Sequence, residues 1–163
     1  MPAGFTVDSS GNESDDSPSG CAAVDAMDTD TPGEVDAEIT FEKAGTGPSI
    51  IAAYTLQPGQ AEKSFAGFKN AVKSCATFDF PNEDGSVMKF TTKALPAPKL
   101  GDESFGIRSA ATAEGRKIGL DVTAVRVGDV LAVVIHAAAG TPDSALSETL
   151  LTKAVKNLEA AAG

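Results

Sequence analysis

The chain has 163 residues, 42% hydrophobic and 22% charged, and this size and composition suit one globular domain with one hydrophobic core. Its formal net charge is −10, from 23 carboxylates against 13 lysines and arginines. We therefore exclude nucleic acid as a partner, because binding it requires a net basic surface that displaces counterions from phosphates.

The acid excess is concentrated at the N-terminus, where residues 1–35 contain eight carboxylates and no lysine or arginine. Residues 1–20 are mostly Ser, Gly, Asp, Glu, Pro and Asn, which bury too little apolar surface to offset the entropy of ordering. We predict a flexible acidic arm over residues 1–20 and a single α+β domain over residues 21–163. Docking of Phe5 and Val7 on that domain is the alternative.

No stretch of the chain holds the roughly 20 apolar residues of a membrane-spanning helix. The start, MPAGFTVDSS, lacks the charged and apolar regions of a signal peptide. Met1 can equally be a new start that replaces a removed signal or anchor. We expect a soluble chain whose only membrane attachment would be a tether absent from this sequence.

The first half of the domain predicts two helices and two strands. Residues 21–27 (CAAVDAM) suit a short helix, and residues 37–42 alternate apolar and polar side chains as a half-buried strand does. Residues 49–56 predict a more apolar strand. Apolar side chains recur at helical spacing over residues 61–74, which predicts an amphipathic helix that packs on a sheet.

The second half predicts five further strands, the first two over residues 76–80 and 87–94. Residues 103–137 read as three antiparallel strands, because the two-residue turn candidates Glu114-Gly115 and Gly128-Asp129 divide them. The segment Val130 to Ile135 (VLAVVI) is apolar on both faces and should be central in the sheet.

The chain ends in a predicted helix, with Thr141 as its N-cap and Pro142 at its first position. Taken together, the elements predict an α+β fold: an antiparallel sheet of about six to seven strands with flanking helices, the longest at the C-terminus.

The two cysteines, Cys21 and Cys75, lie far apart, with no second cysteine or histidine nearby to complete a zinc site. A disulfide between them would fix the start of the domain to the end of the predicted internal helix. Two buried free thiols are the alternative, and the residues alone leave both open.

One acidic segment partly matches a calcium-binding loop. Its matching residues, at loop positions 1, 3, 6, 7 and 9, are Asp28, Asp30, Gly33, Glu34 and Asp36. The closing position holds Ile39 where a bidentate glutamate belongs, and Pro32 interrupts the ligands. We expect a solvated acidic loop and no metal site.

His136 is the single histidine, so a Ser-His-Asp or Cys-His mechanism would have to use it. The sequence has no G-x-S-x-G nucleophile motif. Gly45 and Gly47 are followed by Pro48 and a strand, which does not suit a nucleotide-binding loop. We predict no catalytic residue and no cofactor.

The stretches LGDESFGIRSAATAEG (Leu100 to Gly115) and DVTAVRVGDVLAVVIHAAAGTPDSALSETLLTKAVKNL (Asp121 to Leu158), with SGC at Ser19 to Cys21, carry a family resemblance. The chain resembles actinobacterial secreted and lipoprotein sensor-like domains, related to the extracellular domain of the PknH-type receptor kinases. The resemblance implies a secreted or membrane-tethered domain with a ligand-binding cleft. It also implies an oxidising compartment and so favours the Cys21–Cys75 disulfide. The kinase sensor domain has more than one disulfide, whereas this chain has two cysteines and no tryptophan.

These observations predict an extracytoplasmic, non-catalytic module that binds a small molecule or a cell-envelope component. A hydrolase using His136 and a purely structural envelope protein are the alternatives. If helices cover one sheet face, ligand contacts should come from polar residues of the other face: Tyr54, Arg108, Arg126 and His136. A solvated polar sheet face is the alternative. On neighbouring strands, Arg108 and Arg126 could hold one anionic group together.

Overall fold

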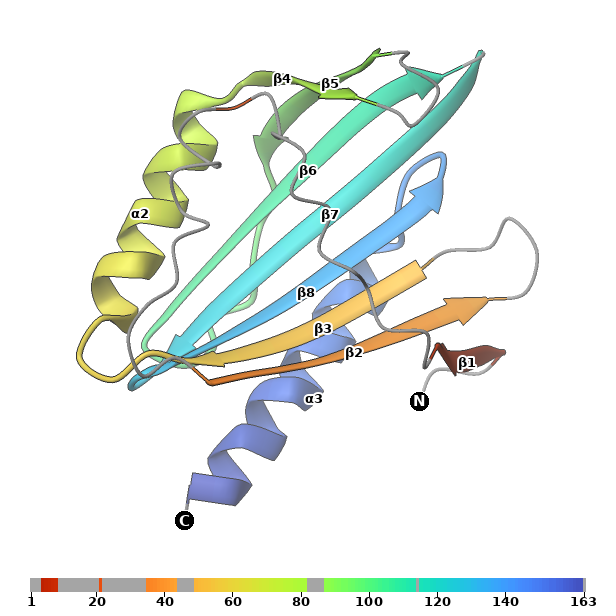
Figure 1. Ribbon diagram of the computed structural model, residues 1–163. Helices are drawn as coiled ribbons and strands as arrows, with labels where there is room; N and C mark the ends of the chain where they lie inside the picture. The colour runs from red at the N-terminus through yellow and green to blue at the C-terminus, as the bar shows by residue number, and fades with distance from the viewer. Residues whose placement is uncertain are drawn as a thin grey trace.

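The computed structural model describes residues 4–8, 21, 35–43, 49–81, 87–113 and 115–162, which form one antiparallel sheet of eight strands and two helices (Figure 1). The strands are β1 (Phe5–Asp8), β2 (Val35–Lys43), β3 (Ser49–Leu56), β4 (Thr77–Pro81), β5 (Val87–Ala94), β6 (Glu103–Ala113), β7 (Arg116–Val127) and β8 (Val130–Ala139). The helices are α2 (Ala61–Ser74) and α3 (Ser144–Ala162). The predicted antiparallel sheet and the longer C-terminal helix are confirmed.

The strand order is β1-β2-β3-β8-β7-β6-β5-β4. After β3 the chain passes through α2 to the far edge of the sheet, and the strands β4 to β8 then return one beside the next until β8 pairs with β3. The predicted central position of Val130 to Ile135 is confirmed, because β8 has a partner on each side. Central strands bury both faces, which explains why this segment is continuously apolar.

One helix lies on each face of the sheet, α2 in front and α3 behind in Figure 1. Successive side chains of a strand point to opposite faces, so alternate residues of one strand meet different helices. The α3 face holds the main core: Phe5, Ile50, Val125, Val134, Leu151 and Val155. On the α2 face, Phe65 is buried and the ring of Phe68 meets that of Phe105 edge-on, with centroids 6.0 Å apart.

The sheet has one or two strands more than the sequence predicted, because residues 5–8 of the acidic segment form β1. Phe5–Asp8 pairs with Thr40–Lys43 at the outer edge of β2. Phe5 is 6% exposed within the α3-face core, whereas Val7 is 51% exposed. Phe5 thus docks on the core, although the composition of residues 1–20 predicted a flexible arm. The domain boundary at residue 20 stays a prediction.

The predicted start of the C-terminal helix is wrong by two residues. Helix α3 begins at Ser144, and Asp143 caps it, since its Oδ1 accepts a hydrogen bond from the Ala145 amide at 3.0 Å. Pro142 lies in the connection before the helix, and its carbonyl accepts a hydrogen bond from Arg108 at 3.0 Å. Of the helix predicted over residues 21–27, all but Cys21 lies outside the described residues, as does most of the acidic loop at 28–36.

Candidate functional site

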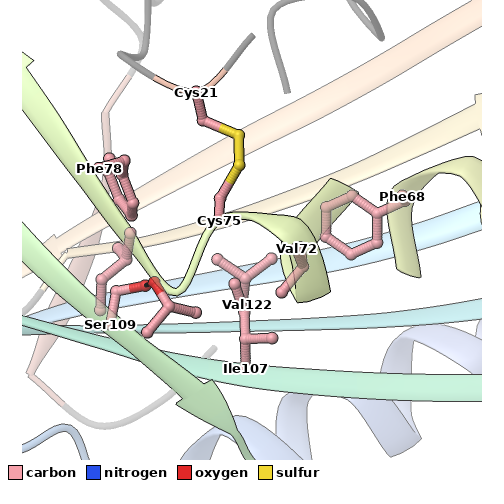
Figure 2. Close-up of a pocket in the computed structure, with 10 residues that line it drawn as sticks. Cys21, Phe68, Val72, Cys75, Phe78, Ile107, Ser109 and Val122 are labelled. Carbon is pink, nitrogen blue, oxygen red and sulfur yellow. Dashed lines mark hydrogen bonds between the residues drawn. A yellow bond between two sulfur atoms is a disulfide. The ribbon is translucent and has the colours of Figure 1, made fainter. Parts of the chain in front are cut away.

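A pocket of about 150 Å³ lies on the α2 face, between α2, the strands β4 to β7 and the disulfide (Figure 2). Ten residues line it: Cys21, Phe68, Val72, Cys75, Phe78, Thr92, Ile107, Ser109, Leu120 and Val122. The pocket is only partly enclosed, so one side of it is open to solvent. It is therefore accessible to a small molecule.

The disulfide between Cys21 and Cys75 forms one rim of the pocket, with Phe68 and Phe78 on either side in Figure 2. Cys75 directly follows α2, and Cys21 is 4% exposed. The predicted disulfide is confirmed, with the two Cα atoms 6.1 Å apart. It ties Cys21 to the residue that follows α2 and so holds the wall of the pocket in place.

The pocket walls are apolar and well supported from behind. Phe68 contacts Phe105 edge-on, and the ring of Phe78 stacks on that of Phe90 with centroids 5.0 Å apart. Ile107 and Val72 are buried. The ten lining residues include no charged side chain and no histidine, so the pocket can enclose an apolar group but offers no general acid or base.

Two hydroxyl groups supply the polar side chains of the lining. Thr92 in β5 and Ser109 in β6 lie directly opposite each other in the sheet, and their side-chain oxygens are 2.9 Å apart. Ser109 is 1% exposed, whereas Thr92 is half-buried. One hydroxyl donates to the other, and this pair sits in an otherwise apolar surface.

The four residues predicted to contact ligand do not line this pocket, and they do not share a sheet face. In the strand register, Tyr54 pairs with the buried Ala132, and both Arg108 and His136 pair with the buried Asp121. Paired residues share a face, so these three side chains lie on the α3 face. Arg126 pairs with Glu103 and lies on the α2 face. The expectation that Arg108 and Arg126 hold one anion together is therefore wrong, because the sheet separates them. A separate ligand-contact role for each of the four stays a prediction.

Arg108 belongs to a buried ion pair that fastens α3 to the sheet. Its Nε and Nη2 atoms each donate to a carboxylate oxygen of Asp121 at 2.6 Å, and Asp121 is completely buried. Nη2 also donates to the Pro142 carbonyl and to the Ser144 hydroxyl, just before and at the start of α3. The hydrogen bond to Asp121 raises the pKa of Arg108. The geometry gives this arginine a structural role.

His136 is also enclosed by α3. Its Nδ1 lies 2.9 Å from the Ser147 hydroxyl, and both residues are 1% exposed. Burial lowers the pKa of His136, against smaller opposing effects of Asp121 and Asp143. A general base must reach its substrate, so hydrolysis through His136 would require α3 to move.

Arg126 lies in a polar cluster, where it contacts Asp102 at 3.1 Å and Glu103 at 3.4 Å. A shallow depression of about 290 Å³ beside it is lined by Gly59, Glu62, Arg126, Gly128 and Asp129. Tyr54 is half-buried, and burial raises its pKa. Within the part of the chain that the structure describes, neither Arg126 nor Tyr54 contacts a group that suggests a reaction.

Sequence reasoning missed the hydroxyl pair. Ser109 lies in the first of the strands predicted over residues 103–137 and Thr92 in the strand predicted over residues 87–94, and only the β5–β6 register brings the two together. The sequence did contain a signal for the Arg108–Asp121 pair. The predicted two-residue turn at Glu114-Gly115 aligns Ala113 with Arg116, which sets Arg108 opposite Asp121.

Among the described residues, no helix is both long and apolar enough to cross a membrane. The same part of the chain contains no group of three or more His, Cys, Asp or Glu side chains able to hold a metal ion.

No protein-family model matches this chain, and no curated protein matches it. Among solved structures, it is similar to the extracellular domain of PknH from Mycobacterium tuberculosis, with a TM-score of 0.64. The match covers 94% of this chain and 78% of that one, at 15% sequence identity. This likeness establishes a shared fold and supports the resemblance to the extracellular domain of the PknH-type receptor kinases.

Proposed function

We propose that this chain is an extracytoplasmic, non-catalytic binding or sensing module that takes a small molecule into the disulfide-rimmed pocket. The observation that carries the proposal is the pocket itself, an apolar cavity of about 150 Å³ that opens to solvent. Apolar cavities with a few polar groups are typical of ligand sites. The shared fold with a receptor-kinase extracellular domain supports the sensing role.

The location belongs to the same proposal. A disulfide persists in oxidising compartments, and Cys21–Cys75 suits a secreted or membrane-anchored protein of the cell envelope. Anchoring as a lipoprotein and an actinobacterial origin are further parts of this proposal, as the sequence resemblance implies. The ligand is then a small molecule or a cell-envelope component that reaches the pocket from outside.

Benzene is a suitable first probe, because a dry engineered cavity of about the same volume binds it. We expect benzene to cause saturable ¹³C-methyl chemical shift changes in Val72, Ile107, Leu120 and Val122. Val122→Phe should abolish them by filling the pocket. Val133→Phe is the matched control, since Val133 is half-buried on the same sheet face but does not line the pocket.

Absence of saturable changes in the wild-type protein would refute binding in this pocket and leave the purely structural alternative. Equal loss of binding in both variants would show that Val122→Phe acts by disturbing the sheet. The hydrolase alternative predicts turnover of an ester substrate that His136→Gln removes and Val122→Phe retains.

A further inference from the structure

The Thr92–Ser109 pair leaves one hydroxyl hydrogen for a ligand. In a hydrogen bond between two hydroxyls, one donates its hydrogen and the other accepts with a lone pair. The hydrogen of the accepting hydroxyl then needs an acceptor of its own. Within the described residues neither side chain has another hydrogen-bond acceptor beyond the 2.9 Å contact, so that hydrogen is available to water or to a ligand.

The rest of the lining sets the charge of the ligand. Eight of the ten lining residues are aliphatic, aromatic or part of the disulfide, and the other two are the hydroxyl pair. Burying a charge without a partner costs several kcal/mol. An ammonium group would also add hydrogens where an acceptor is needed. The pocket therefore disfavours ions and favours a neutral molecule.

The volume of the pocket limits the size of the group that it can enclose. An apolar cavity of about 150 Å³ accommodates benzene, a molecule of about six heavy atoms. The pocket has a similar volume and is open on one side, so a group of this size can be enclosed while a longer molecule extends outward.

We propose that the pocket binds a compact, uncharged hydrocarbon group bearing one acceptor oxygen, such as a ketone, ester or ether, that receives a hydrogen bond from Thr92 or Ser109. This inference rests on the proposed function and specifies the ligand class of the same site. A free small molecule and the end of a larger envelope component share this chemistry.

The test compares cyclohexanone with methylenecyclohexane, which has nearly the same shape but no oxygen. Each is titrated into the oxidised 163-residue chain and followed by the methyl shifts of Leu120 and Val122. The double variant Thr92→Val/Ser109→Ala removes both hydroxyls with little change in shape. We expect it to weaken cyclohexanone binding about tenfold, the usual cost of leaving a buried polar group unpaired. Methylenecyclohexane binding should stay the same or tighten.

The comparison uses the ratio of the two dissociation constants within each protein, because the ketone is better hydrated than the alkene. The single variants Thr92→Val and Ser109→Ala each keep one hydroxyl and should retain most of the wild-type ratio. Cyclohexylammonium should give no saturable shift. To separate the two sources, cyclohexyl acetate is compared with the same ester on a long chain; stronger binding of the long ester favours an envelope component.

An unchanged ratio in the double variant would overturn the assignment of the acceptor oxygen, and binding of cyclohexylammonium as tight as that of cyclohexanone would overturn the neutral class. Both results leave the proposed function intact if benzene still binds. If no probe, benzene included, shifts the pocket methyls, the proposed function fails together with this inference.

Discussion

Arg108 and Asp121 face each other across β6 and β7 and form a two-point ion pair with both N···O distances at 2.6 Å. The carboxylate is fully buried, while the arginine is 16% exposed at the side chain. Because Arg108 also bonds Pro142 and Ser144, this pair joins the sheet to the start of α3.

Arg108→Ala should therefore lower the free energy of unfolding by about 3–5 kcal/mol, the cost of leaving a buried charge without its partner. Arg126→Ala is the control. Its carboxylate partners, Asp102 and Glu103, are 52% and 35% exposed, and its loss should cost at most about 1 kcal/mol. Urea unfolding measures both. Similar values for the two variants would contradict a structural role specific to Arg108.

The stability of the protein should fall as pH decreases below about 6.5. Burial lowers the pKa of His136 below its ordinary value of 6.5, so the folded protein keeps this ring neutral while the unfolded chain protonates it. The full contribution is present above the unfolded pKa and is lost toward the lower folded pKa. His136 is the single histidine, so its effect can be isolated.

Urea unfolding between pH 7.5 and 5.5 should show a slope of up to about 1.4 kcal/mol per pH unit at the acid end. His136→Gln should flatten this slope. A wild-type slope that persists in the variant would mean that carboxylates, not His136, dominate this range.

Loss of the disulfide should destabilise the fold and weaken ligand binding in the pocket. The bond spans 54 residues, and closing a loop of that length contributes about 4 kcal/mol in the chain-entropy model, an upper figure. Cys21→Ala/Cys75→Ala should lower the melting temperature and reduce benzene affinity. Alkylation with and without reductant, followed by mass measurement, gives the redox state. Two reactive thiols in the unreduced native protein would contradict the bond.

Phe5→Ala should destabilise the protein although Phe5 lies in the acidic segment. Its ring is 6% exposed in the α3-face core, and truncating a buried phenylalanine typically costs about 3–5 kcal/mol. Val7→Ala is the matched control from the same strand and should cost less than about 0.5 kcal/mol, as surface substitutions do. Thermal melts that do not distinguish Phe5→Ala from wild type would place β1 outside the cooperative unit.

Local sequence patterns determined most of the elements. The helix over residues 61–74 and the strand over residues 49–56 have the predicted bounds. Helical spacing of apolar side chains and a short apolar run can each be seen within one segment, without knowledge of the rest of the chain. The succession of hairpins determined the antiparallel sheet. One aromatic residue among polar neighbours, Phe5, was a weaker signal, because its docking depends on a free edge of β2 that forms elsewhere.

The tertiary structure decided which side chains meet. Arg108 and Arg126 lie on adjacent strands but on opposite faces, because the register pairs Arg108 with Asp121 and alternation then turns Arg126 the other way. The pocket depends on still more distant relations, since its walls come from Cys21, α2 and four strands. Each of these segments forms from local patterns. Their meeting around the Thr92–Ser109 hydroxyls depends on strand order, register and the disulfide, which no single segment encodes.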